Sequence, residues 1–205
     1  MRFSTTACLT AFILSTHVFA APTNNTLSDS STVAFKVSAY AVELQQSVDN
    51  MASSIGENLS SINSTAPSSS GLAGLPTVIK SFQNAVESFT ATKNAVLPMV
   101  ENPALDFTIE EIEQLIKVLE VYKTVLSTLE QTVDAVINAF FPGLIDFFKP
   151  FIRIRINVVD SFTTPFLTFY TDLVGTLSGS PDLARLIHDY IVEIKDIRDG
   201  FLLSF

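Results

Sequence analysis

The chain has 205 residues, of which 47% are hydrophobic, and its formal net charge at pH 7 is −9. An acidic chain is not drawn to nucleic acids or to anionic membrane surfaces, so neither is expected as a partner. The sequence holds one cysteine and two histidines, too few for a zinc site built from His and Cys ligands, and neither a metal nor a cofactor is expected.

Residues 1–20 are typical of a secretory signal peptide. Arg2 provides the positive charge, residues 7–13 form a short apolar run, and Ala20 ends a small-residue cleavage site. The apolar run is too short to span a membrane, and no other stretch reaches about 20 apolar residues without a charge. We therefore expect a secreted protein, extracellular or in the cell wall, without a transmembrane span.

Cleavage of the signal removes Cys8, so the mature chain is expected to be free of cysteine and to depend on its core for stability. Residues 21–31 are polar and are expected to form a flexible N-terminus, whereas residues 32–205 suit a single domain. Three sequons predict a glycosylated N-terminal part, with acceptors at Asn24, Asn58 and Asn63.

Two amphipathic helices are predicted in the first half of the chain. From Thr32 to about Asn58, apolar residues recur at steps of three and four. A loop rich in Ser, Pro and Gly follows over residues 63–74. Pro76 suits the first turn of the second helix, which Pro98 and Pro103 are expected to close.

The third helix has the clearest signals. Thr108 and Glu111 fit a capping box, in which each side chain accepts a hydrogen bond from the backbone N–H of the other residue. Apolar residues then follow a heptad pattern from Ile112 to Phe140. This predicts a helix over 109–141 that is about 50 Å long at ~1.5 Å per residue. A long bundle helix is the favoured interpretation, and a coiled-coil dimer is the alternative.

The next stretch is rich in phenylalanine and is punctuated by three prolines. Pro142 is expected to end the third helix, and Pro150 and Pro165 to kink a fourth helix over residues 143–177. Apolar and polar residues alternate over 152–158, as they do in a strand, but no second strand is predicted to pair with it.

Ser180 and Pro181 are expected to cap and open a fifth helix, with Asp182 in its first turn. The segments together predict an all-α protein. It should be a single-domain, up-and-down bundle of about five amphipathic helices, one of them long and one Pro-kinked and Phe-rich.

The sequence lacks the parts of a catalytic site. Ser178 or Ser180 with His188 and Asp189 could suggest a nucleophilic triad, but His188 and Asp189 are neighbours on one helix and point to different faces. The capping box explains the acidic residues at the start of the third helix. We expect no catalytic residues and no enzymatic activity.

The excess of phenylalanine points instead to hydrophobic binding, because aromatic rings bury large apolar areas. An apolar tail could lie among the rings with Arg153 or Arg155 at its carboxylate head group, or each Arg could simply reach the surrounding water. The rings could also be core alone, in a secreted interaction or effector protein. The candidate ligand-binding residues are Phe82, Phe89, Phe147, Phe148, Phe151, Phe162, Phe166 and Phe169.

Thr77–Pro142 contains a helix with Phe82 and Phe89, the sequence Thr92-Lys93, a proline-containing loop and a long leucine-rich helix. In this order and composition it resembles the fungal hydrophobic-surface-binding protein A and cell-wall mannoprotein family, which has no short diagnostic motif. After residue 140 the chain is Phe-rich where that family is Ala/Ser-rich. The resemblance implies a non-enzymatic protein of the cell wall or medium that adsorbs to hydrophobic surfaces, holds fatty acids between helices, or recruits secreted hydrolases or cell-wall components.

Overall fold

The structure is a computed structural model and describes residues 29–64, 70–101, 107–139 and 142–203. These residues form five helices and no strand, which confirms the predicted all-α fold. The alternating residues 152–158 lie in a helix. The helices are α1 (Asp29–Ser64), α2 (Ser70–Val100), α3 (Ile109–Ala139), α4 (Pro142–Thr176) and α5 (Pro181–Leu203).

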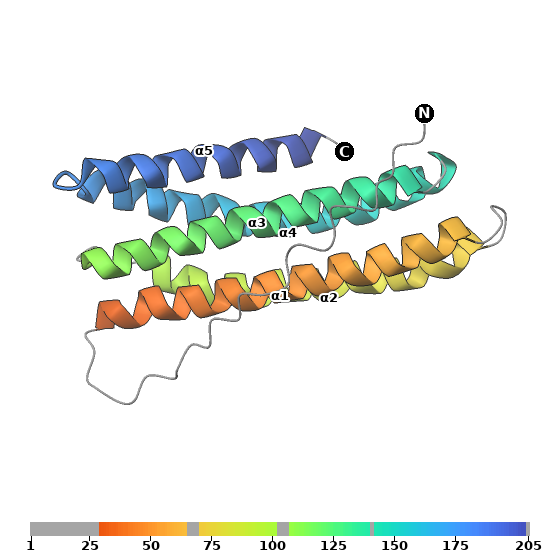
Figure 1. Ribbon diagram of the computed structural model, residues 1–205, viewed down its shortest axis with the longest axis horizontal. Helices are drawn as coiled ribbons and strands as arrows, with labels where there is room; N and C mark the ends of the chain where they lie inside the picture. Colours follow the sequence, from red (N-terminus) through yellow and green to blue (C-terminus); the bar gives the residue numbers. More distant parts are fainter. Residues whose placement is uncertain (1–28, 65–69, 102–106, 140–141, 204–205) are drawn as a thin grey trace.

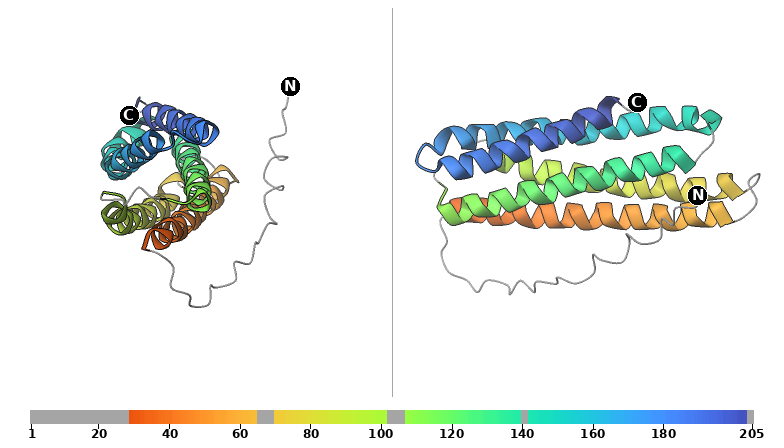
Figure 2. Two further views of the ribbon diagram at one scale, coloured as in Figure 1. Left: turned by 90° about the vertical axis from the view of Figure 1, so that its left-hand side faces the viewer. Right: turned by 45° about the horizontal axis from the view of Figure 1, so that its top comes forward.

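The helices lie side by side in a long bundle (Figure 1), with α1, α3 and α5 running in one direction and α2 and α4 in the other. α1 packs against α2 and α3, α5 packs against α3 and α4, and α4 packs against α2, so that the five helices close a ring. Figure 2 shows this ring end-on, with α4 and α5 on one side of α3 and with α1 and α2 on the other.

The apolar stripes predicted from the sequence form the core of this ring. Steps of three and four residues place side chains on one face of a helix, because an α-helix has 3.6 residues per turn. The heptad residues of α3 are buried against other helices of the same chain, as expected for a long bundle helix. They are Ile112, Leu115, Leu119, Tyr122, Leu126, Leu129, Val133 and Val136.

The capping box at the start of α3 is confirmed. The backbone N–H of Thr108 donates to Glu111 Oε2 at 2.7 Å, and the backbone N–H of Glu111 donates to Thr108 Oγ1 at 3.3 Å. The two bonds satisfy N–H groups that a helix start leaves without an intrahelical partner. Glu111 is buried, and its Oε2 takes part in the capping box, whereas its Oε1 makes no hydrogen bond within the described part of the chain.

The first two helices are longer than predicted. α1 extends from Asp29 to Ser64, and α2 begins at Ser70, so that Pro76 and Pro98 lie inside α2. Each proline removes one backbone donor from its helix, but both side chains are exposed, where water can hydrate the freed carbonyl groups. The helix therefore tolerates prolines that the sequence alone marks as its ends.

The second half follows the prediction more closely. The described part of α3 ends at Ala139, and α4 begins at Pro142 and continues through Pro150 and Pro165. A short turn after Thr176 leads to α5 at Pro181, the predicted start. In this turn the N–H of Leu177 donates to Val174 O at 3.1 Å. Residues 1–28, which include the predicted signal peptide, lie outside the described residues.

Candidate functional site

A cluster of aromatic rings joins α3 to α4 across the ring of helices. The Tyr122 ring of α3 meets Phe162 of α4 edge-on at 5.4 Å and Phe166 at 5.0 Å between centroids. Phe162 and Phe166 stack at 5.0 Å, and Tyr170 lies 5.0 Å from Phe166. Such edge-on and stacked pairs contribute about 0.5–1.5 kcal/mol each beyond the area that they bury. We call Tyr122, Phe162, Phe166, Phe169 and Tyr170 the aromatic cluster.

The hydroxyl groups of two buried tyrosines, Tyr122 and Tyr170, form hydrogen bonds between α3 and α4. Tyr122 Oη lies 2.5 Å from Thr163 Oγ1, and the Thr163 hydroxyl donates to Val159 O at 2.8 Å, so Tyr122 is the donor in its pair. Tyr170 Oη donates to Leu115 O of α3 at 2.9 Å. Burial raises the pKa of both phenols, because the charged phenolate would lose its hydration.

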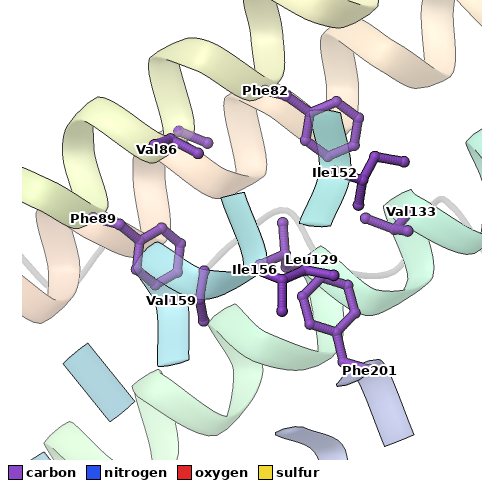
Figure 3. A pocket seen from close by; sticks show the side chains of 10 residues that line it. Phe82, Val86, Phe89, Leu129, Val133, Ile152, Ile156, Val159 and Phe201 are labelled. Atoms are coloured by element: carbon purple, nitrogen blue, oxygen red, sulfur yellow. The ribbon is translucent and has the colours of Figure 1, made fainter. Parts of the chain in front are cut away.

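A first apolar cavity of about 20 Å³ lies where α2, α3, α4 and α5 meet (Figure 3). Figure 3 shows side chains from all four helices converging on it. Every lining side chain is apolar, and no polar surface reaches the cavity. The lining residues include Phe82, Phe89, Leu129, Val133, Ile152, Ile156, Val159 and Phe201.

A second cavity, of about 10 Å³, lies beside the aromatic cluster. Its walls come from α1, α2, α3 and α4, and they are apolar apart from the Thr92 side chain and the Tyr122 phenol. The lining residues include Val37, Leu44, Val96, Tyr122, Phe162 and Phe166.

The size of these cavities decides what they can hold as they stand. A single water molecule needs a cavity volume of about 10–15 Å³, and it also needs polar partners, which an apolar wall does not offer. Each cavity is therefore a small, largely apolar gap in the packing. An alkyl chain could enter either of them only if helices moved apart.

The structure brings several predicted residues together in the core. Phe82 and Phe89 line the first cavity, Phe162 and Phe166 line the second, and Phe169 is buried in the aromatic cluster. The remaining predicted phenylalanines and one arginine cannot be placed in this way. The side chains of Phe147, Phe148, Phe151 and Arg155 lie outside the described residues.

Arg153 is exposed on α4, next in sequence to the cavity residue Ile152. A guanidinium group at this position is surrounded by water, and the structure brings it to neither cavity lining. The small size of the cavities and the exposure of Arg153 leave the suggested head-group role as a prediction.

Several cavity residues are absent from the sequence-based candidates. Leu129, Val133 and Phe201 line the first cavity from α3 and α5, and Tyr122 lines the second. The periodic stripes identify all four as inward-facing, but periodicity carries no information about which stripes meet. Phenylalanine content therefore identifies only part of the cavity lining.

The remaining predicted sites are placed as follows. His188 and Asp189 are both exposed on α5. Among the described residues, no group of three or more His, Cys, Asp or Glu side chains could hold a metal ion. Asn58 lies in α1, where its Nδ2 donates to Ser54 O at 2.6 Å, whereas Asn24 and the Asn63 side chain fall outside the described part of the chain.

Within the part of the chain that the structure describes, no helix combines the length and the apolar character needed to cross a membrane. Comparison of the chain with protein-family models, with curated proteins and with solved structures finds no match.

Proposed function

We propose that this chain is a secreted, non-enzymatic protein that binds lipids or hydrophobic surfaces through the inward faces of its helices. The observation that carries the proposal is the apolar interior of the bundle, where α2, α3, α4 and α5 line the first cavity and α1, α2, α3 and α4 line the second. The aromatic cluster lies beside the second cavity. Hydrocarbon is the chemical partner that such a surface accepts without leaving polar groups unpaired.

Secretion is supported by residues 1–20, whose charge and apolar pattern match a signal peptide. Secreted hydrolases and cell-wall components are further partners suggested by the resemblance to hydrophobic-surface-binding proteins. The formal charge of −9 argues against nucleic acid as a partner.

The proposal is tested on protein secreted from a host that expresses the full chain. Organic extraction with mass spectrometry reports any lipid that co-purifies, titration with a fluorescent fatty acid reports single-chain binding, and adsorption to oil droplets reports surface binding. Phe35→Ser should leave binding unchanged if the inward faces bind the lipid, because Phe35 is 56% exposed and lines neither cavity. Absence of lipid, of fatty-acid binding and of adsorption would exclude this function.

The second candidate is a secreted interaction or effector protein whose aromatic residues form only the core. The small size of both cavities favours it. Exposed apolar side chains on α1 offer such a protein a contact surface; they are Phe35 and Val42. Phe82→Ala separates the candidates, because Phe82 lines the first cavity. A core role predicts a loss of about 3–5 kcal/mol in stability, whereas a ligand role predicts weaker lipid binding with a much smaller loss.

A further inference from the structure

The start of α3 holds a buried carboxylate that the capping box satisfies only in part. Glu111 is 4% exposed, and its Oε2 accepts the 2.7 Å hydrogen bond from the backbone N–H of Thr108. Its Oε1 is also buried and accepts no hydrogen bond from the described residues. A buried carboxylate oxygen has lost its hydration, so leaving it without a donor is costly. A positively charged N–H donor would bind this oxygen best.

The described parts of the neighbouring helices do not supply that donor. Lys36 of α1 and Lys117 of α3 are both exposed, and neither bonds Glu111 Oε1. Figure 1 shows that α1, α3 and α5 all begin at this end of the bundle. Further carboxylates lie at the helix ends here, with Glu101 directly after α2 and Asp182 in the first turn of α5. Their charges attract a cation to this end.

The residues that precede α1 are long enough to reach Glu111. α1 and α3 run in the same direction, and Gln114 of α3 bonds Ser38 of α1. This register places Glu111 level with the second turn of α1, so it lies about 9 Å along the bundle from Asp29 at ~1.5 Å per residue. Cleavage of the predicted signal peptide leaves residues 21–28 ahead of α1. A segment of this length spans at most about 28 Å, which also covers the ~8–10 Å between neighbouring helices.

Glu111 lies at the rim of the bundle and not deep inside it. The three residues before it, Thr108, Ile109 and Glu110, are all exposed, and Ile109 is 62% exposed. An α-amino group at a chain end is small and carries three N–H donors when it is protonated, so it can approach the carboxylate from this rim. Its ordinary pKa is about 7.7–8.0, and it is therefore charged at pH 7.

We propose that cleavage of the signal peptide creates the donor, and that the α-ammonium group of Ala21 binds Glu111 Oε1. The pair fastens the new N-terminus to the start of α3 and completes the hydrogen bonding of the buried carboxylate. In the uncleaved precursor residue 21 carries a peptide bond and no charge, so the precursor is less stable than the mature protein. The inference rests on the secretion in the proposed function and is independent of lipid binding.

Ala21→Gln tests the ammonium group at constant chain length. Glutaminyl cyclase converts an N-terminal glutamine to pyroglutamate with release of ammonia, which removes the positive charge. Urea unfolding of the secreted protein at pH 7 is compared before and after cyclisation, which should lower the equilibrium constant for folding about tenfold. Cyclisation should have no effect when Glu111→Gln is also present, since glutamine keeps a capping acceptor but no charge. The matched control is Glu113→Gln, which removes an exposed carboxylate two residues away and should leave the full effect.

N-terminal sequencing separates the two ways in which the experiment can fail. If the chain is not secreted with residue 21 at its N-terminus, the predicted secretion and cleavage are wrong, and the pair is excluded with them. If residue 21 is the N-terminus but cyclisation changes nothing, or acts equally with Glu111→Gln, the pair alone is excluded. Carbodiimide coupling of the unaltered mature protein decides the matter if Glu111→Gln does not fold. An amide between the Ala21 amine and the Glu111 carboxylate in peptide mass spectra supports the pair, and coupling of that amine only to other carboxylates overturns it.

Discussion

Phe166 is the residue whose removal tests the core most severely. It is 1% exposed, and its ring lies 5.0 Å from each of Tyr122, Phe162 and Tyr170. Phe166→Ala removes the central ring of the aromatic cluster and enlarges the second cavity, which Phe166 already lines. The surrounding helices are long and fixed by other contacts, so the site can collapse only in part.

The expected loss of stability is about 4–5 kcal/mol. Truncation of a buried phenylalanine costs about 3–5 kcal/mol, and three aromatic pairs place Phe166 at the upper end of that range. Phe35→Ala is the control: Phe35 is 56% exposed on α1, and its truncation should change stability by no more than about 0.5 kcal/mol.

The assay is urea unfolding followed by far-UV circular dichroism. Phe166→Leu is measured beside the alanine variant, because it keeps an apolar side chain and remains folded if the alanine variant does not. The chain contains no tryptophan, so helical signal is a better probe than indole fluorescence. A loss below about 2 kcal/mol for Phe166→Ala would refute the reasoning, since it would mean that the ring is not tightly packed or that the helices close the gap.

Three further predictions follow from the hydrogen bonds of α3 and α4. Tyr122→Phe should lower the free energy of unfolding by only about 0.5–1.5 kcal/mol, because the Thr163 hydroxyl still donates to its own helix. A larger loss of stability in urea unfolding would contradict this. Thr108→Ala should lower the free energy of unfolding by about 0.5–2 kcal/mol, because it removes one half of the capping box with Glu111. Thr108→Ser keeps a hydroxyl group and should retain most of this stability; equal losses for both variants would argue against the cap. Burial raises the pKa of Tyr122 and Tyr170 above the ordinary value of 10.0, so their contribution to stability is full below pH 10.0 and is lost as the unfolded chain ionises above it. The free energy of unfolding should therefore fall with pH in this alkaline range, and less steeply in Tyr122→Phe; a flat profile in the unaltered protein would exclude the effect.

The sequence by itself determines most of the local structure. The steps of three and four along α3 mark Leu115, Leu119 and Tyr122 as one inward face, and Thr108 with Glu111 marks the start of that helix. These features follow from helix geometry and from hydrogen bonds within a few residues, so they can be read without knowledge of the fold.

The tertiary structure alone decides which inward faces meet. The sequence indicates that Tyr122 and Phe166 both point inward, but not that they touch, nor that Phe201 of α5 closes a cavity with Phe82 of α2. Hydrophobic attraction is non-directional, and every apolar stripe is a possible partner for every other. Side-chain shapes along whole helices select the ring order, and with it they set the small volume of the cavities.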